Sequence, residues 1–291
     1  MQSDWKHEDI ELADMTMHYA RSYSPGQPPL VLAHGFTDNG MCWLPVAQAL
    51  SVDYDVILPD ARGHGLSSRV TPGQPLDGAA DLAAFIQALG LNRPIVGGHS
   101  MGASVAASMA ARFPEIPGSL ILEDPAWGDR FLPKTDEEEA AERAERERAA
   151  AEKGETIVDP WADWVATYQN RPAEEVIALG REKNPTWEEA EFPHWAESKL
   201  QMDPNYVSAR SVTPRSDWRE VVKAIQVPTL LITADPAKGG IVTPEVALEA
   251  QELNPVVRVV YFEEAGHNIR REAFEPFMEA VLTFLEDLKE F

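Results

Sequence analysis

The pentapeptide Gly98-His99-Ser100-Met101-Gly102 decides the fold predicted for this chain. A short apolar run at 95–96 precedes it, and a small, alanine-rich stretch at 102–112 follows it. The pentapeptide matches the pattern G-x-S-x-G, in which a serine occupies a sharp, strained turn between a strand and a helix. Glycines two positions before and after the serine let strand and helix approach without Cβ clashes. We therefore predict that Ser100 is a nucleophile, above a helix N-terminus that favours developing negative charge.

Short apolar runs bounded by Gly, Pro and Asp recur on both sides of this turn. They lie at 15–19, 29–33, 55–58, 95–96, 120–122, 229–233 and 256–262. Runs of this kind are typical of buried strands in a parallel sheet. Helical periodicity is found between them at 79–89, 102–112, 245–253 and 271–289. The alternation predicts an α/β fold with crossover connections.

The alternation breaks between residue 127 and about residue 218. Residues 136–153 are rich in Ala, Glu and Arg with little apolar stripe, which predicts a solvated helix. We predict that 126–214 form an inserted helical cap and that 1–125 and 215–291 form the core. The tryptophans of this region line a substrate cavity or pack the cap onto itself and the core. The candidates for substrate contact are Trp127, Trp164 and Trp187.

Two other loops follow predicted strands early in the chain. His34-Gly35-Phe36 ends the run at 29–33, where a loop normally supplies one donor of an oxyanion hole. The other donor comes from the residue after the nucleophile, so we expect the backbone N–H groups of Phe36 and Met101 to fill this role. Residues 60–67 form a glycine-rich turn with Asp and Arg, which we expect to brace the loop by hydrogen bonds.

A histidine completes the set of candidate catalytic residues. Ala265-Gly266-His267-Asn268 follows the last predicted strand. Of the seven histidines, His267 alone comes late enough to complete the chain order serine, acid, histidine. We therefore predict that His267 is the general base that takes the proton of Ser100.

Together, these motifs resemble the α/β-hydrolase superfamily, closest to the branch of small esterases, cofactor-free haloperoxidases and carbon–carbon bond hydrolases. The resemblance covers roughly residues 10–125 and 215–291. It implies a mostly parallel eight-stranded sheet flanked by helices, with an inserted helical cap. The cap carries no recognisable motif, so the resemblance does not specify a substrate.

The acid of the triad is the point where the sequence departs from the family pattern. The resemblance implies an acid after the seventh strand, in the pattern Gly-x-x-Asp. Here the stretch is Ala234-Asp235-Pro236-Ala237, with alanine at both signature positions. Some relatives instead carry the acid just after the sixth strand, where Glu123 and Asp124 lie. Asp235 is the preferred prediction because of its loop, and Asp124 or Glu123 is the alternative acid.

The resemblance implies a serine hydrolase that cleaves a carboxylic ester, or a related acyl bond, of a small organic substrate through an acyl-enzyme. Lactone hydrolysis, carbon–carbon bond hydrolysis and perhydrolysis use the same triad and stay open. A non-catalytic ligand receptor on the same fold also stays open. Ser100 excludes the haloalkane dehalogenases and epoxide hydrolases of this fold, because those enzymes attack with a carboxylate.

Composition limits the partners. The 291 residues include 25 Lys and Arg against 48 Asp and Glu, a net charge of −23. This charge repels nucleic acid and disfavours strongly anionic substrates unless a local basic pocket compensates. The chain has a polar start, one cysteine and no apolar run of about 18 residues, so we expect a cytoplasmic protein without a membrane partner. No metal-ligand spacing or dinucleotide motif is visible, so we expect neither metal nor cofactor. The oligomeric state stays open.

Overall fold

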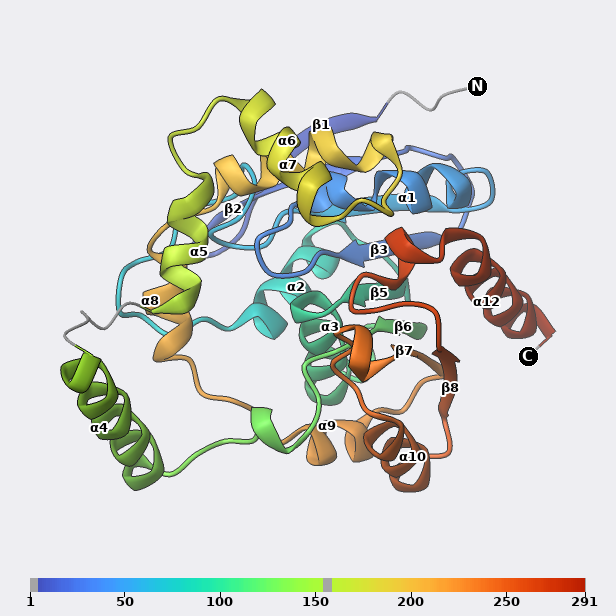
Figure 1. The fold of residues 1–291 in the computed structure, drawn as a ribbon. Helices are drawn as coiled ribbons and strands as arrows, with labels where there is room; N and C mark the ends of the chain where they lie inside the picture. Colours follow the sequence, from blue (N-terminus) through green and yellow to red (C-terminus); the bar gives the residue numbers. More distant parts are fainter. Residues whose placement is uncertain (1–4, 154–158, 291) are drawn as a thin grey trace.

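The computed structural model describes residues 5–153 and 159–290, which contain an eight-stranded sheet with helices on both faces (Figure 1). The strand order is β1-β2-β4-β3-β5-β6-β7-β8. The strands are β1 (Lys6–Glu11), β2 (Thr16–Arg21), β3 (Pro29–Ala33), β4 (Asp55–Pro59), β5 (Ile95–His99), β6 (Ser119–Glu123), β7 (Thr229–Ala234) and β8 (Val257–Phe262). β2 runs antiparallel to β1 and β4, and all other neighbours are parallel. The predicted mostly parallel sheet is confirmed.

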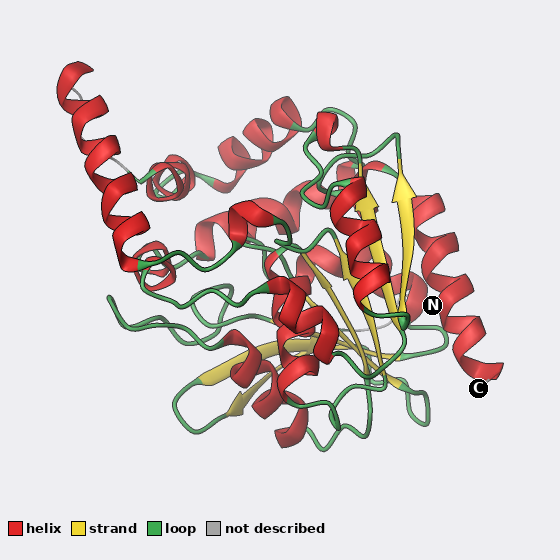
Figure 2. Cartoon of the chain, turned by 90° about the horizontal axis from the view of Figure 1, so that it is seen from below, coloured by secondary structure: helices red, strands yellow, loops and turns green. Residues whose placement is uncertain are grey.

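Helices lie on both faces of the sheet (Figure 2), and each face is covered by a hydrophobic cluster. One contains buried residues of α2 (Gly78–Ala88), α3 (Met101–Arg112), α9 (Trp218–Ala224) and α10 (Pro244–Leu253). The other contains buried residues of α1 (Leu44–Leu50) and α12 (Phe274–Asp287). Four alanines of α3 are at most 1 % exposed, so this helix lies close to the sheet beneath the elbow. The small side chains predicted for that helix therefore serve close packing.

Two expectations about the core need correction. β1 was not predicted, because its sequence KHEDIE is charged and lacks an apolar run. It forms an edge strand that leaves alternate residues exposed, which explains the weak signal. The helix expected at 271–289 is broken at Ala273, whose φ of −143° separates α11 (Ile269–Glu272) from α12.

Only helices are present between β6 and β7 in the described part of the chain. They are α4 (Asp136–Lys153), α5 (Pro160–Tyr168), α6 (Ala173–Lys183), α7 (Phe192–Gln201) and α8 (Tyr206–Ser211), followed by α9. α6 and α7 pack around Tyr168, Val176 and Trp195, while α4 projects away from the sheet (Figure 1). Helices α4 to α8 form the inserted helical cap, whereas α9 packs with the core. None of the helices described here combines the length and apolar character needed to cross a membrane.

Candidate active site

Ser100 lies on a strained turn between β5 and α3. Its backbone has φ 52° and ψ −110°, a conformation that costs a non-glycine residue on the order of 1–3 kcal/mol. A Cβ at Gly98 would lie 2.4 Å from the Gly102 backbone, and one at Gly102 would lie 2.3 Å from the Ala33 carbonyl oxygen. Both glycines are therefore required by close backbone approach. The Ser100 N–H donates to the Glu123 carbonyl oxygen at 2.8 Å, which fixes the turn against β6.

His267 faces a buried carboxylate at the end of β6. Its Nδ1 lies 2.6 Å from Oδ2 of Asp124, whose side chain is 0 % exposed. The same carboxylate accepts the backbone N–H groups of Ile241 at 2.8 Å and Val242 at 2.9 Å. Three donors thus hold the carboxylate in place. With Nδ1 bonded to Asp124, the Nε2 atom of His267 is left to accept a proton.

Asp235 does not make the contact expected of it. Its Oδ1 accepts the Ala237 N–H at 2.9 Å, so the side chain caps the short 3-10 turn Pro236–Lys238. No hydrogen bond joins Asp235 to His267 among the described residues, and the preferred acid of the sequence prediction is wrong as the partner of His267. The physical reason is local: β7 passes directly into a proline-initiated turn that uses the carboxylate as its cap.

The other alternative, Glu123, is also engaged elsewhere. It is 0 % exposed and accepts both the backbone N–H of Arg270 at 2.9 Å and the Arg270 guanidinium at 3.0 Å. Consecutive residues at the end of a strand face opposite sides, so Glu123 and Asp124 reach different partners. Asp124 is the carboxylate that the structure brings to His267.

The two expected oxyanion donors are free amides. The loop after β3 forms a turn closed by the Asp38 N–H donating to the Gly35 carbonyl at 3.1 Å, with Thr37 at φ 68°. Phe36 occupies this turn, and within the described residues its N–H donates to no backbone acceptor. Met101 is the first residue of α3, so its N–H has no intrahelical acceptor. Both amides are available to an anion.

The remaining histidines near the elbow have structural contacts. His34 bridges two loops, with its Nε2 accepting the Ala61 N–H at 2.9 Å and its Nδ1 donating to the Gly35 carbonyl at 2.8 Å. His99 donates from Nε2 to the His267 carbonyl at 2.9 Å, which anchors the His267 loop. Burial lowers the pKa of both rings, so both are neutral near pH 7.

The loop at 60–67 is also structural. Asp60 accepts the Gly40 N–H at 2.7 Å and the Leu66 N–H at 2.9 Å. Ser67 donates from its hydroxyl to the Asp60 carbonyl at 2.6 Å. These bonds match the bracing expected from the sequence.

A buried ion cluster joins the cap to the Phe36 turn. Lys199 of α7 places its Nζ 2.6 Å from Asp38 Oδ1 and 3.0 Å from the Thr37 carbonyl oxygen. Arg271 lies 3.0 Å from the other Asp38 oxygen. The neighbouring Arg271, Lys199 and Arg270 cations hold the pKa of the Asp38 carboxyl well below its usual range, against the opposing effect of burial. The side chain of the residue whose backbone N–H closes the Phe36 turn is thus held by Lys199 of the cap.

The same cluster reaches the segment after His267. Arg271 contacts Glu191 of the cap at 3.0 Å, and Arg270 contacts Glu123 of β6 at 3.0 Å. The Arg270 guanidinium also lies 4.2 Å from the centre of the Trp43 ring. Sequence reasoning missed this cluster. The adjacent Arg270 and Arg271, three and four residues after His267, were a signal, whereas nothing in the sequence distinguished Lys199.

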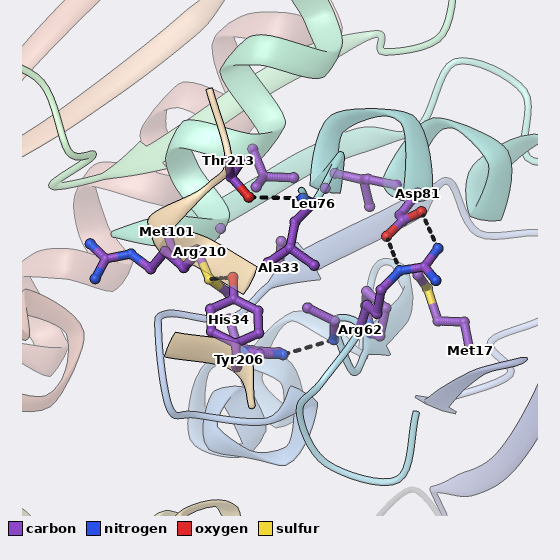
Figure 3. A pocket seen from close by; sticks show the side chains of 16 residues that line it. Met17, Ala33, His34, Arg62, Leu76, Asp81, Met101, Tyr206, Arg210 and Thr213 are labelled. Atoms are coloured by element: carbon purple, nitrogen blue, oxygen red, sulfur yellow. Dashed lines mark hydrogen bonds and ion pairs between the residues drawn. The ribbon is translucent and has the colours of Figure 1, made fainter. Parts of the chain in front are cut away.

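A cavity of about 170 Å³ lies beside the elbow (Figure 3). Its wall includes Ala33, Met101 and Gly102 from the core and Tyr206 and Arg210 from α8. The Tyr206 hydroxyl lies 3.1 Å from the Met101 sulfur, which joins the cap to the residue after the nucleophile.

The three candidate tryptophans do not line this cavity. Trp127 is 3 % exposed and stacks on Trp218 in the core, with ring centres 5.9 Å apart. Trp187 stacks on Phe192 inside the cap, and Trp164 packs edge-on against Tyr168. The structure therefore favours the packing interpretation for these rings. Contact of these rings with a substrate stays a prediction.

The comparisons with known proteins agree with this fold. Fold and elbow define an α/β protein with a hydrolase-type site. The sequence pattern of the Alpha/beta hydrolase family matches residues 30–280, and the chain belongs to that family.

Several relatives match over nearly the whole chain. An N-formylmaleamate deformylase of Pseudomonas putida is 29% identical over 284 residues, covering 96% of each chain. A 2-(acetamidomethylene)succinate hydrolase of Mesorhizobium japonicum is 27% identical over 263 residues, covering 90% of this chain and 89% of the relative. The solved structure of an N-formylmaleamic acid deformylase from Pseudomonas putida S16 superposes with a TM-score of 0.70 at 25% identity, covering 95% of this chain and 100% of that one.

Proposed function

We propose that this protein is a serine hydrolase that cleaves a carboxylic ester, or a related acyl bond, of a small organic substrate. One observation carries the proposal: Ser100 lies on a strained strand–turn–helix elbow, and the His267–Asp124 pair, at 2.6 Å, follows other strands of the same sheet. The carboxyl ends of parallel strands meet at one edge of a sheet, where such sites form. Asp124 takes the role of the acid in place of Asp235.

The proposed reaction has two acyl-transfer steps. The Ser100 hydroxyl attacks the substrate carbonyl while His267 takes its proton. Asp124 holds the imidazole tautomer and stabilises the imidazolium, and the amides of Phe36 and Met101 bind the developing oxyanion. His267 then protonates the leaving group, and water, deprotonated by His267, releases the acid from the acyl-enzyme. The ordered contacts around Asp124 support its role, because a fixed carboxylate fixes the tautomer.

Hydrolysis of an acyl–nitrogen bond is a second candidate. Two relatives that match at least nine-tenths of the chain carry names that denote removal of a formyl group and hydrolysis of an acetamido compound. The mechanism is the same, with an amine as the leaving group. We also propose that residues 126–214 act as the cap over this site, since α8 of that segment contacts Met101 through Tyr206.

A parallel screen of the wild type and Ser100→Ala tests this proposal. The substrates are p-nitrophenyl esters, small lactones and N-acyl amides. The wild type is expected to hydrolyse at least one class, and Ser100→Ala is expected to lose at least about a thousand-fold in kcat, because the triad acts as a unit. Hydrolysis that survives in a pure, folded Ser100→Ala protein would overturn the proposal.

A further inference from the structure

The cavity beside the elbow carries one uncompensated charge. Its charged lining residues are Arg62, Asp81 and Arg210. Arg62 and Asp81 neutralise each other through two contacts, of 3.0 Å and 2.9 Å, and Arg62 also contacts Asp14. Within residues 5–153 and 159–290, the Arg210 guanidinium makes no ion pair or hydrogen bond. The cavity wall therefore has a net positive charge in a chain whose net charge is −23.

Arg210 packs over the side chain of Phe36, the residue whose backbone amide is the proposed oxyanion donor. Its guanidinium carbon is 5.3 Å from the centre of the Phe36 ring and 5.6 Å from the centre of the Trp161 ring. Both rings help to hold the side chain, which is exposed at the cavity rim. In Figure 3, Arg210 extends to the side opposite the Arg62–Asp81 pair, so that pair does not screen it. The guanidinium thus packs between two aromatic rings, and its N–H donors bond to no other described residue.

The surrounding charges leave this position open to an anion. The carboxylate of Asp159 attracts the Arg210 guanidinium electrostatically but forms no ion pair with it. Asp159 instead caps α5, where it accepts the Trp161 N–H at 2.8 Å. Arg215 adds a second positive charge on the same side. A guanidinium presents two parallel N–H donors that match a carboxylate.

We propose that Arg210 binds a carboxylate of the substrate, so that this site prefers acyl compounds with a free carboxylate over neutral ones of equal length. The inference rests on the proposed hydrolase function and specifies its substrate class. The local cation offsets the repulsion that the acidic chain exerts on an anionic substrate. Binding through a fixed fork also orients the acyl group relative to Phe36 and Met101.

A matched pair of esters tests this inference. Mono-p-nitrophenyl adipate and p-nitrophenyl hexanoate have acyl chains of equal length, and the adipate replaces a terminal methyl with a carboxylate. The wild type is expected to prefer the adipate in kcat/KM. Arg210→Gln is expected to lose roughly ten-fold or more on the adipate and to stay within about two-fold on the hexanoate, because a charge-assisted pair is removed. Arg210→Lys keeps the positive charge but loses the two parallel N–H donors. Its kcat/KM on the adipate ester should lie between those of the wild type and Arg210→Gln.

Arg215→Gln is the matched control, because it removes one positive charge five residues away and leaves Arg210 in place. It should lower the preference for the adipate ester much less than Arg210→Gln does. A protection experiment makes the same comparison without turnover. Free adipate should slow the labelling of Ser100 by a fluorophosphonate in the wild type and not in Arg210→Gln. An equal effect of Arg210→Gln on both esters, or protection that survives in that variant, would overturn the inference. The proposed hydrolase function is tested separately by Ser100→Ala. If this variant loses hexanoate hydrolysis, the hydrolase function holds even when the Arg210 inference fails.

Discussion

At the scale of single residues, the acid is identified by the hydrogen bonds that each candidate carboxylate accepts. Asp235 and Asp124 both follow a strand and both precede a proline, so the sequence did not separate them. The structure does so through hydrogen bonds: Asp235 caps its own turn, while Asp124 accepts from Ile241, Val242 and His267. A φ of 45° at Asp124 turns the chain directly after β6. The amino-acid sequence around Asp124 does not reveal this backbone conformation.

We expect Asp124→Asn to lower kcat by roughly four orders of magnitude, as in the serine-protease case where the wrong histidine tautomer is favoured. The amide also presents an N–H₂ group to one of the two backbone N–H donors, which should cost about 1–3 kcal/mol of stability. Steady-state kinetics and thermal unfolding measure the two effects. Asp235→Asn is the matched control and should retain kcat within a few-fold. A larger loss in Asp235→Asn than in Asp124→Asn would contradict the assignment.

At the scale of elements, the cap and the two catalytic loops share one buried ion cluster. Lys199 of α7 binds the Thr37 carbonyl and Asp38, and Arg271 of α11 binds Asp38 and the cap residue Glu191. Thr37 has φ 68°, which is unfavourable for a β-branched residue. The Lys199 contact offsets this strain in the turn that carries Phe36. The cap therefore stabilises the geometry of the core loop in addition to covering it.

We expect Lys199→Met to lower the free energy of unfolding by about 3 kcal/mol, because it leaves a buried carboxylate with one partner fewer. The kcat should fall roughly ten-fold or more at nearly unchanged KM, since the oxyanion donor acts mainly in the transition state. Denaturant unfolding and steady-state kinetics measure both.

Arg21→Met is the control for a purely structural loss. It breaks the half-buried Arg21–Asp55 pair, at 2.5 Å, where β4 begins, away from the carboxyl ends of the parallel strands. This variant should lose stability and keep kcat. A Lys199→Met protein that behaves in the same way would show that the cluster stabilises the fold without positioning the Phe36 turn.

At the scale of the whole molecule, the parts of the fold that carry strong local signals were predictable. The seven apolar runs match β2 to β8, most clearly for β3 to β7, which are buried on both faces. The Ser100 elbow follows from its glycines. β1 escaped prediction because an edge strand tolerates charge. The acid, the ion cluster around Asp38 and the position of Arg210 beside Phe36 depend on contacts between residues far apart in sequence. Such contacts leave no local pattern.

The central claim is that His267 and Asp124 activate Ser100, and active-site labelling tests it most directly. The folded protein is treated with a fluorophosphonate, and the rate and position of the adduct are followed by intact mass and peptide mapping. We expect a single adduct, on Ser100, that forms at least about a hundred-fold more slowly in His267→Ala, because the general base is lost. An adduct on another residue, or equal rates in the wild type and His267→Ala, would contradict it.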